Sequence, residues 1–440
     1  MNKFLKISLI LFFFTLYPKI SFSLTSASYL IANAAFYSYD YETAVTYFKK
    51  DDSNDFNIAE LRKRMLSYII SKKLKKANSL AIKIIELDNN NEDALMVILT
   101  FAKLSNNLNE FNNFINLSND SEIINYVFYD KNQIINNNND IAKNLFNLVL
   151  TINSPNSNFQ KNIDYYLFYL NLALNLKPNF NEVLFFKAQI YQQLEYYSKA
   201  EKIYNNIQQD HDLYIEAQKN IIIIKKNIKQ FDIALKLLIN LIDIYHNNNS
   251  LIVLQADLYR TNSEYNKAID LYSLLINKKN LGDIQLWRMY FLRAICYEKL
   301  NKWKQAEKDL LHALNLQPEQ PQVLNYLAYG WIEKNINIEK SIEMLEVAFN
   351  KKPDSHYILD SLAWAYYKKN NFLKALELME KVIEIAPSEA ISLDHLGDIY
   401  FSLGREREAY FMWKQAFELA QPVDNIKKNI KIKINKYNEK

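Results

Sequence analysis

The sequence predicts an all-α fold built from antiparallel helix pairs that stack one on the next, and three observations lead to it. Only four glycines and eight prolines occur among the 440 residues, too few for the tight turns of a many-stranded sheet protein. Hydrophobic residues make up 49% of the chain, enough to form a substantial core. Small residues also recur in pairs twelve positions apart, and the pairs repeat about every 34 residues.

These pairs divide residues 181–423 into seven units. Two antiparallel helices approach closely only where their side chains are small, so each pair is expected to mark a helix crossing. Aromatic residues three positions from the small ones would fill the space around the crossing. The twelve-residue pairs are Ala188/Ala200, Ala256/Ala268, Ala294/Ala306, Ala363/Ala375 and Gly397/Ala409.

Two departures from the repeat predict a local change of curvature. Ile222 stands where a small residue is expected, and extra residues from Leu281 to Gln285 precede the next unit. Upstream, residues 24–180 carry a weaker pattern that begins with Ala32 and Ala44, again twelve apart. We interpret this region as divergent helical repeats of the same kind, with a loop at 132–140.

The two ends of the chain carry their own signals. Lysines precede the apolar run Ile7–Tyr17, and small residues follow at Ser21 and Ser23, which predicts a cleaved signal peptide over 1–23. Export to the periplasm or cell envelope follows, with an uncleaved membrane anchor as the alternative. Residues 424–440 alternate lysine with isoleucine and predict a capping helix, or alternatively a basic tail that touches a membrane.

The sequence lacks the common motifs of catalytic and cofactor sites, which argues against an enzyme. No glycine-rich phosphate loop is present, and the five histidines form no paired metal motif, so no cofactor or metal is expected. A formal net charge of +4 is too small to indicate a surface that binds nucleic acid. We interpret Asp394, His395 and Asp398 as a polar surface with a solvated histidine, and the one cysteine, Cys296, as a packed hydrophobe far from any lipidation position.

The repeat pattern resembles the tetratricopeptide-repeat (TPR) family over more than half the chain. This resemblance implies a right-handed α-solenoid whose first helices line a concave, protein-binding surface. The segments Leu324–Tyr329, Leu359–Tyr366 and Asp394–Asp398 are further similar to bacterial envelope TPR proteins. That group includes a lipoprotein adaptor for a periplasmic C-terminal-processing protease. The resemblance implies a non-catalytic scaffold or adaptor, and the alternative is a membrane-anchored organiser of an envelope complex.

A stripe of residues recurs at the repeat spacing on these first helices, and we predict that it contacts a protein or peptide partner. Large aromatics beside carboxylates and an amide suit an extended peptide or a partner helix. The alternative is that Tyr329 and Trp364 only pad neighbouring helices. The predicted partner-binding residues are Asn325, Tyr329, Asp360, Trp364, Tyr367, Asp394, Asp398 and Phe401.

Overall fold

The computed structural model describes residues 24–49, 57–117, 121–131, 133–152, 159–246, 248–278, 281, 284–420 and 426–438. The predicted signal peptide at 1–23, and part of the insertion predicted around 281–285, lie outside these residues. Within them the chain forms 24 helices and one short two-stranded ribbon. The prediction of an all-α fold is therefore confirmed.

The chain divides into two compact units, residues 1–228 and 229–440. The first unit packs its helices mainly as consecutive pairs, such as α2 with α3, α4 with α5, α9 with α10 and α11 with α12. Its helices are α2 (Leu24–Tyr37), α3 (Tyr41–Phe48), α4 (Ile58–Ile70), α5 (Leu74–Leu87), α6 (Glu92–Leu104), α7 (Leu108–Leu117), α8 (Glu122–Phe128), α9 (Asn138–Ile152), α10 (Phe159–Leu176), α11 (Asn181–Gln193), α12 (Tyr197–Tyr204) and α13 (Tyr214–Asn227).

The loop predicted at 132–140 is shorter than expected. Strands β1 (Tyr129–Asp130) and β2 (Gln133–Ile134) pair antiparallel, and α9 already begins at Asn138. The side chain of Asn137 accepts a hydrogen bond from the backbone N–H of Asn139 at 2.9 Å and so starts the helix. The asparagine run that looks like a loop in composition is divided between a short connection at 135–137 and the first turn of α9.

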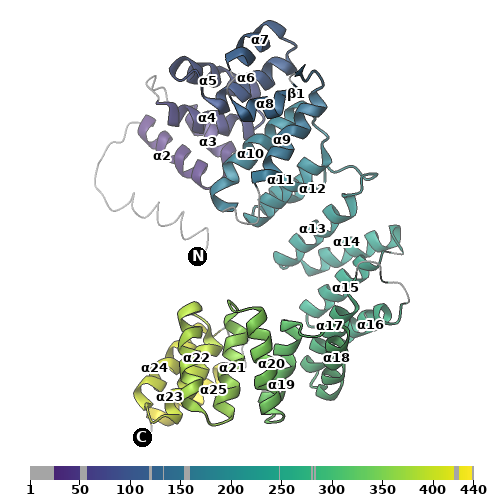
Figure 1. Cartoon of the computed structure of the whole chain (residues 1–440), viewed down its shortest axis with the longest axis vertical. Coiled ribbons are helices and arrows are strands. Elements are labelled where there is room, and N and C mark those ends of the chain that lie inside the picture. Colours follow the sequence, from purple (N-terminus) through teal and green to yellow (C-terminus); the bar gives the residue numbers. More distant parts are fainter. Residues whose placement is uncertain are drawn as a thin grey trace. The chain divides into compact units, whose positions relative to one another are not determined.

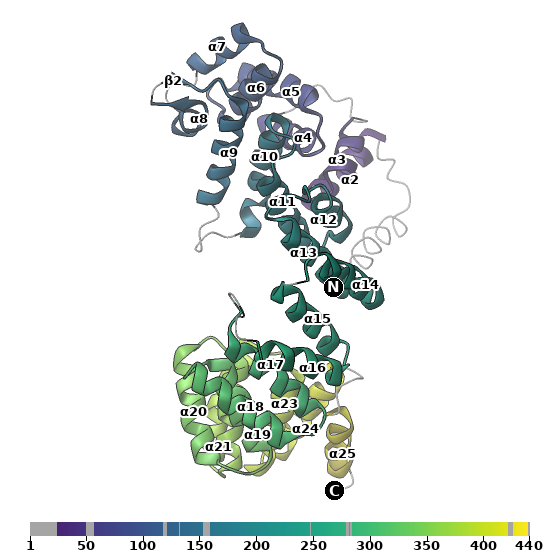
Figure 2. The same cartoon turned by 90° about the vertical axis from the view of Figure 1, so that its right-hand side faces the viewer.

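The second unit repeats one hairpin after another. Each first helix packs on its own second helix, and α16, α20, α22 and α24 also pack on the helix that follows. Figure 1 shows this succession, and Figure 2 shows α25 beside α24. The helices are α14 (Phe231–Ile244), α15 (Asn249–Thr261), α16 (Tyr265–Ile276), α17 (Leu286–Lys299), α18 (Trp303–Leu316), α19 (Pro321–Glu333), α20 (Ile338–Lys351), α21 (His356–Lys368), α22 (Phe372–Ile385), α23 (Ala390–Ser402), α24 (Glu406–Leu419) and α25 (Ile426–Asn438).

The small residues of the repeat lie where two helices need close approach. Ala256 and Ala268, Ala294 and Ala306, and Ala363 and Ala375 are all fully buried. The expected pair at Ile222 and Ala234 is divided, because α13 belongs to the first unit and α14 to the second. The division therefore falls after Ile228, whereas the change from divergent to regular repeats in the sequence lies at residue 180.

Left-handed residues at the hairpin turns explain how the fold manages with so few glycines. Asn301, Asn370 and Gly404 have φ of 57°, 62° and 77°. Asparagine tolerates this conformation better than most residues. In each case the next backbone N–H bonds back to the carbonyl five residues earlier, which is the Schellman closure of a helix end. The bonds are Lys302 to Tyr297 at 2.8 Å, Asn371 to Tyr366 at 2.9 Å and Arg405 to Tyr400 at 2.9 Å.

No helix within the described residues combines the length and the apolar character needed to cross a membrane.

Candidate functional site

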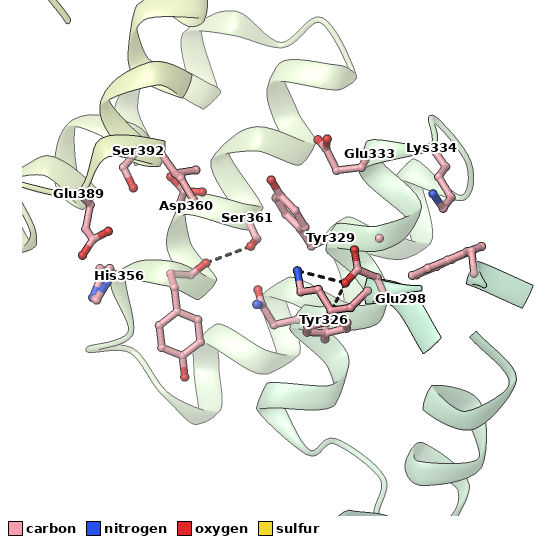
Figure 3. A pocket seen from close by; sticks show the side chains of 16 residues that line it. Glu298, Tyr326, Tyr329, Glu333, Lys334, His356, Asp360, Ser361, Glu389 and Ser392 are labelled. Atoms are coloured by element: carbon pink, nitrogen blue, oxygen red, sulfur yellow. Dashed lines mark hydrogen bonds and ion pairs between the residues drawn. The ribbon is translucent and has the colours of Figure 1, made fainter. Parts of the chain in front are cut away.

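A groove of about 380 Å³ runs across four first helices of the second unit, α17, α19, α21 and α23. Figure 3 shows its polar side chains converging from these helices. We call it the α17–α23 groove. It is lined by Glu298, Lys299, Trp303, Asn325, Tyr326, Tyr329, Gly330, Glu333, Lys334, His356, Tyr357, Asp360, Ser361, Glu389, Ile391 and Ser392.

Three of the eight predicted partner-binding residues line this groove: Asn325, Tyr329 and Asp360. The 34- to 35-residue spacing brings Asn325 and Asp360 to equivalent positions on successive first helices. The other five, Trp364, Tyr367, Asp394, Asp398 and Phe401, lie outside its lining.

Carboxylates dominate the charge of the groove. Glu298, Glu333, Asp360 and Glu389 line it, against Lys299 and Lys334. In Figure 3 the hydroxyl end of Tyr329 is directed toward the side of the groove that holds Glu333 and Asp360.

The pKa of Tyr329 reflects the carboxylates on the side of the groove that holds Glu333 and Asp360. Burial raises that pKa well above its usual value, and the carboxylates of Glu333, Asp360 and Asp394 raise it further. Burial and these carboxylates together disfavour a negative charge on the hydroxyl of Tyr329.

Two polar atoms at the groove are buried and have no hydrogen-bond partner among the described residues. One is the acceptor Oδ1 of Asn325, and the other is the donor Nε1 of Trp303. A buried polar atom without a partner costs about 1–3 kcal/mol, so such atoms are candidates to bond a ligand.

Gly330 gives the indole of Trp303 its place at the groove wall. A Cβ at position 330 would lie 2.0 Å from Cη2 of that ring. Any larger residue here would therefore displace the tryptophan.

Trp364 lies in an aromatic stack with His395 and Tyr367. Its ring lies 3.9 Å from that of His395 at an interplanar angle of 12°, and 4.5 Å from that of Tyr367 at 8°. Its Nε1 donates to Oε1 of Glu333 at 2.7 Å. Trp364 of α21 is 6% exposed and contacts Glu333 of α19 and His395 of α23.

The expectation of a solvated His395 is wrong, because this side chain is 6% exposed. Its Nδ1 lies 3.1 Å from Oδ2 of Asp360, on the preceding first helix. Burial alone would lower the pKa of His395, but the carboxylate of Asp360, with smaller contributions from Asp394 and Asp398, outweighs it, so the pKa is raised. Asp360 stands 35 residues before His395 in the chain. The local cluster of Asp394, His395 and Asp398 therefore did not indicate this contact.

Asp394 and Asp398 bind the C-terminal helix of the same chain. Lys433 Nζ lies 2.7 Å from each carboxylate, and Trp413 Nε1 donates to Asp398 Oδ1 at 3.0 Å. Ile430 of α25 is fully buried in the core of the unit. Burial lowers the pKa of Lys433, but the two aspartates outweigh this effect and raise it. Helix α25 thus covers the part of the predicted stripe that these aspartates occupy.

The divergent first unit contains a buried lysine that the repeat pattern did not single out. Lys187 Nζ donates to Oδ1 of Asn171 at 2.6 Å, and its side chain is 5% exposed. Burial lowers the pKa of Lys187 to about 7, with smaller contributions from Lys72 and Lys199. This lysine therefore changes charge near neutral pH.

The described residues contain no group of three His, Cys, Asp or Glu side chains placed to hold a metal ion. Cys296 is buried in the second unit, and burial raises the pKa of its thiol to about 12. A thiol with this pKa is not a nucleophile at neutral pH.

Comparison with known families supports the repeat pattern. A family model described as tetratricopeptide repeat matches residues 182–207, 287–320 and 357–389. These segments cover the hairpins α11–α12, α17–α18 and α21–α22.

Relatives match over part of their length. The TPR repeat-containing protein PA4667 of Pseudomonas aeruginosa is 26% identical over 110 residues, which are 25% of this chain and 18% of that protein. The BBSome complex member BBS4 homolog of Drosophila melanogaster is 22% identical over 166 residues, 37% of this chain and 33% of that protein. The chain thus spans a third or less of these two curated relatives.

Among solved structures, yeast Tom70 aligns with a TM-score of 0.45 at 15% identity, over 94% of this chain and 96% of that one.

Proposed function

This chain is a tetratricopeptide-repeat protein, and from that premise we propose that it is a non-catalytic scaffold or adaptor that holds a peptide or partner protein in the α17–α23 groove. The repeat fold supports a role in protein–protein interaction. The observation that carries the proposal is the groove itself, which crosses four successive first helices and includes three residues of the predicted stripe. A groove that crosses successive repeats suits an extended segment better than a compact small molecule.

The exposed apolar side chains of the groove supply its anchors. Tyr357 is 43% exposed and Ile391 is 47% exposed, on neighbouring first helices. Side chains of this kind lose water when a partner covers them, and each contributes to affinity through the apolar area removed.

We place this scaffold in the periplasm or cell envelope of a bacterium. The basic and apolar N-terminal run supports export, and the similarity of the C-terminal repeats to envelope TPR proteins supports the same compartment. Presentation of substrates to a periplasmic protease is the more specific role that this similarity suggests.

Pull-down from extracts of the producing cell tests the scaffold. The variant carries Tyr357→Ala and Ile391→Ala, which remove exposed side chains of the groove. Its control carries Leu373→Ala and Phe411→Ala, which are 74% and 55% exposed on the second helices α22 and α24. We expect one defined protein that the wild type and the control retain and the groove variant loses. If every protein recovered by the wild type is also retained by the groove variant, the groove is not the binding surface.

A further inference from the structure

We propose that the segment held by the α17–α23 groove is a basic peptide, which places a lysine or arginine side chain beside Glu333 and Tyr329 and bonds its backbone to Asn325 and Trp303. This inference rests on the proposed function and names the chemistry of the partner. It follows from the balance of charge in the groove, from its two unpaired polar atoms, and from the way the next repeats use the same positions.

The lysines of the groove are already engaged. Lys299 Nζ forms an ion pair with Glu298 at 3.3 Å, and Lys334 Nζ lies 5.1 Å from the ring centroid of Trp303. Neither lysine forms an ion pair with Glu333 or Glu389, and no other cation of the described residues does so. Two carboxylates of the groove therefore lack a cationic partner within the described chain.

The surroundings of Tyr329 show where a cation is favoured. Three carboxylates, from α19, α21 and α23, raise the pKa of this tyrosine beyond the effect of burial. A field that disfavours a phenolate favours an ammonium or guanidinium group at the same place. The ring faces of Tyr329 and Tyr326 add an aromatic surface on which such a group can rest.

The two following repeats show the same preference inside the chain. Asp360 receives a cation-forming side chain, His395, from the next first helix, and Asp394 receives Lys433 from α25. Asn325 holds the equivalent position one repeat earlier, where its Oδ1 is left without a partner. Asp360 and Asp394 thus have partners within the chain, whereas Asn325, at the equivalent position in the groove, is left for a group of the bound peptide.

A peptide supplies what the unpaired atoms require, whereas a simple cation does not. Oδ1 of Asn325 accepts a hydrogen bond, and Nε1 of Trp303 donates one. A peptide backbone offers both an N–H and a C=O, so it can satisfy the two atoms together. An acidic peptide would satisfy them equally but would meet the uncompensated carboxylates, which disfavour it.

Selection from a random peptide library tests the inference without knowledge of the natural partner. The probe is a phage-displayed library of 12-residue peptides, selected on the full-length mature protein. The peptides recovered are synthesised with a fluorophore, and their affinities are measured by anisotropy. We expect the groove-dependent peptides to carry a lysine or arginine, and replacement of that residue by norleucine to weaken binding about tenfold or more.

The protein variant removes charge while it keeps shape. Glu298→Gln, Glu333→Gln and Glu389→Gln together leave every acceptor oxygen that Tyr326 and Trp364 use, through the amide carbonyls. We expect the affinity of the selected peptides to fall about tenfold, and the dependence of affinity on salt to weaken. The matched control, Glu343→Gln, Glu384→Gln and Glu418→Gln, removes three exposed carboxylates from the second helices α20, α22 and α24 and should change affinity less than about twofold.

The outcomes separate this inference from the proposed function. Peptides that need Tyr357 and Ile391 for binding, but carry no basic residue and bind the charge-removed variant equally well, would refute the basic partner and leave the scaffold intact. Recovery of no groove-dependent peptide, together with no groove-dependent protein in the pull-down, would overturn both. Asn325→Leu adds a third readout, because loss of the acceptor should weaken basic peptides independently of salt.

Discussion

The imidazole of His395 stacks on the indole of Trp364, with ring centroids 3.9 Å apart, while Nδ1 of the same imidazole lies 3.1 Å from Asp360. One side chain of α23 thus meets both a carboxylate and an aromatic face of α21. Both contacts favour the protonated imidazole, the first by charge and the second through the negative face of the indole ring. The packing of two successive repeats is therefore linked to the protonation of one residue.

This link predicts a dependence of stability on pH. Because the pKa of His395 is raised in the folded state, the stability it contributes is fully present below the unfolded pKa of about 6.5 and is lost as pH rises through the folded pKa. The expected result is a thermal midpoint of the second unit that falls with rising pH above about 6.5. Asp360→Asn should flatten this slope, and thermal denaturation followed at several pH values measures it. An equal slope in the wild type and the variant would refute the link.

Lys187 predicts the opposite slope in the first unit. Its pKa is lowered to about 7 by burial, so between pH 7 and about 10.5 the unfolded chain binds more protons than the folded chain, and stability rises with pH. Lys187→Met removes this dependence of stability on pH. The variant also loses the hydrogen bond to Asn171, and that loss lowers the free energy of unfolding by the same amount at every pH. The difference in free energy of unfolding between wild type and variant, measured by denaturant titration across this range, should grow in favour of the wild type. A constant difference would mean that Lys187 titrates normally.

Gly330→Ala should destabilise the second unit although alanine has the higher helix propensity. The added Cβ would meet the indole of Trp303, and overpacking of this kind costs about 1–3 kcal/mol, against about 1 kcal/mol gained from propensity. Gly397→Ala should act in the same way through Trp413, 2.5 Å from the added atom. Denaturant unfolding measures the loss, and tryptophan fluorescence should shift in both variants.

Gly404→Ala is the control for these two variants. Its site is open but has φ of +77°, so alanine is strained there without touching a tryptophan. Stability should fall while the native fluorescence stays unchanged. A fluorescence shift equal to that of Gly330→Ala would show that the signal does not report displacement of the indole.

Lys433→Met should loosen α25. The substitution leaves Asp394 and Asp398 without their cation in a partly buried site, at a cost of about 1–3 kcal/mol. Lys431→Met, an exposed position on the same helix, is the control and should be nearly neutral. Hydrogen exchange of the α25 amides, compared between the two variants, measures the effect. Equal protection in both would show that the ion pairs do not hold the helix.

Mass spectrometry of the protein isolated from its own cell tests the N-terminal prediction. Cleavage after Ser23 gives a chain that starts at Leu24. A chain that still begins at Met1 would support the membrane-anchored alternative instead.

The repeat spacing predicted the hairpins because the requirement at a helix crossing is local and simple. A bulky side chain cannot occupy the point where two helices approach most closely. The small residues Ala363 and Ala375 therefore mark this point in the sequence. The contact of Asp360 with His395 was harder to predict. Asp360 was part of the predicted stripe and His395 part of the polar cluster beside it, but whether a polar side chain turns to solvent or to the next repeat depends on the packing of both helices.

The groove was predicted in part for the same reason. Asn325, Tyr329 and Asp360 follow the register of the first helices and do line it. The pairing of Lys433 with Asp394 joins residues 39 positions apart, outside the register of the repeats, so the periodic pattern carried no sign that α25 covers these aspartates. Trp303 was missed as a groove residue because it begins a second helix, and only Gly330 on the facing helix lets its indole reach the wall.

The placement of α25 also bears on self-association. A stack of identical hairpins has an adhesive end, since the apolar side of its last helix fits the first helix of any similar stack, including one in another molecule. Ile430 fills that side within the same chain, and Lys433 fastens the helix that carries it. The residues of the second unit that α25 covers are therefore occupied by a segment of the same chain, and another copy could contact them only by displacing α25.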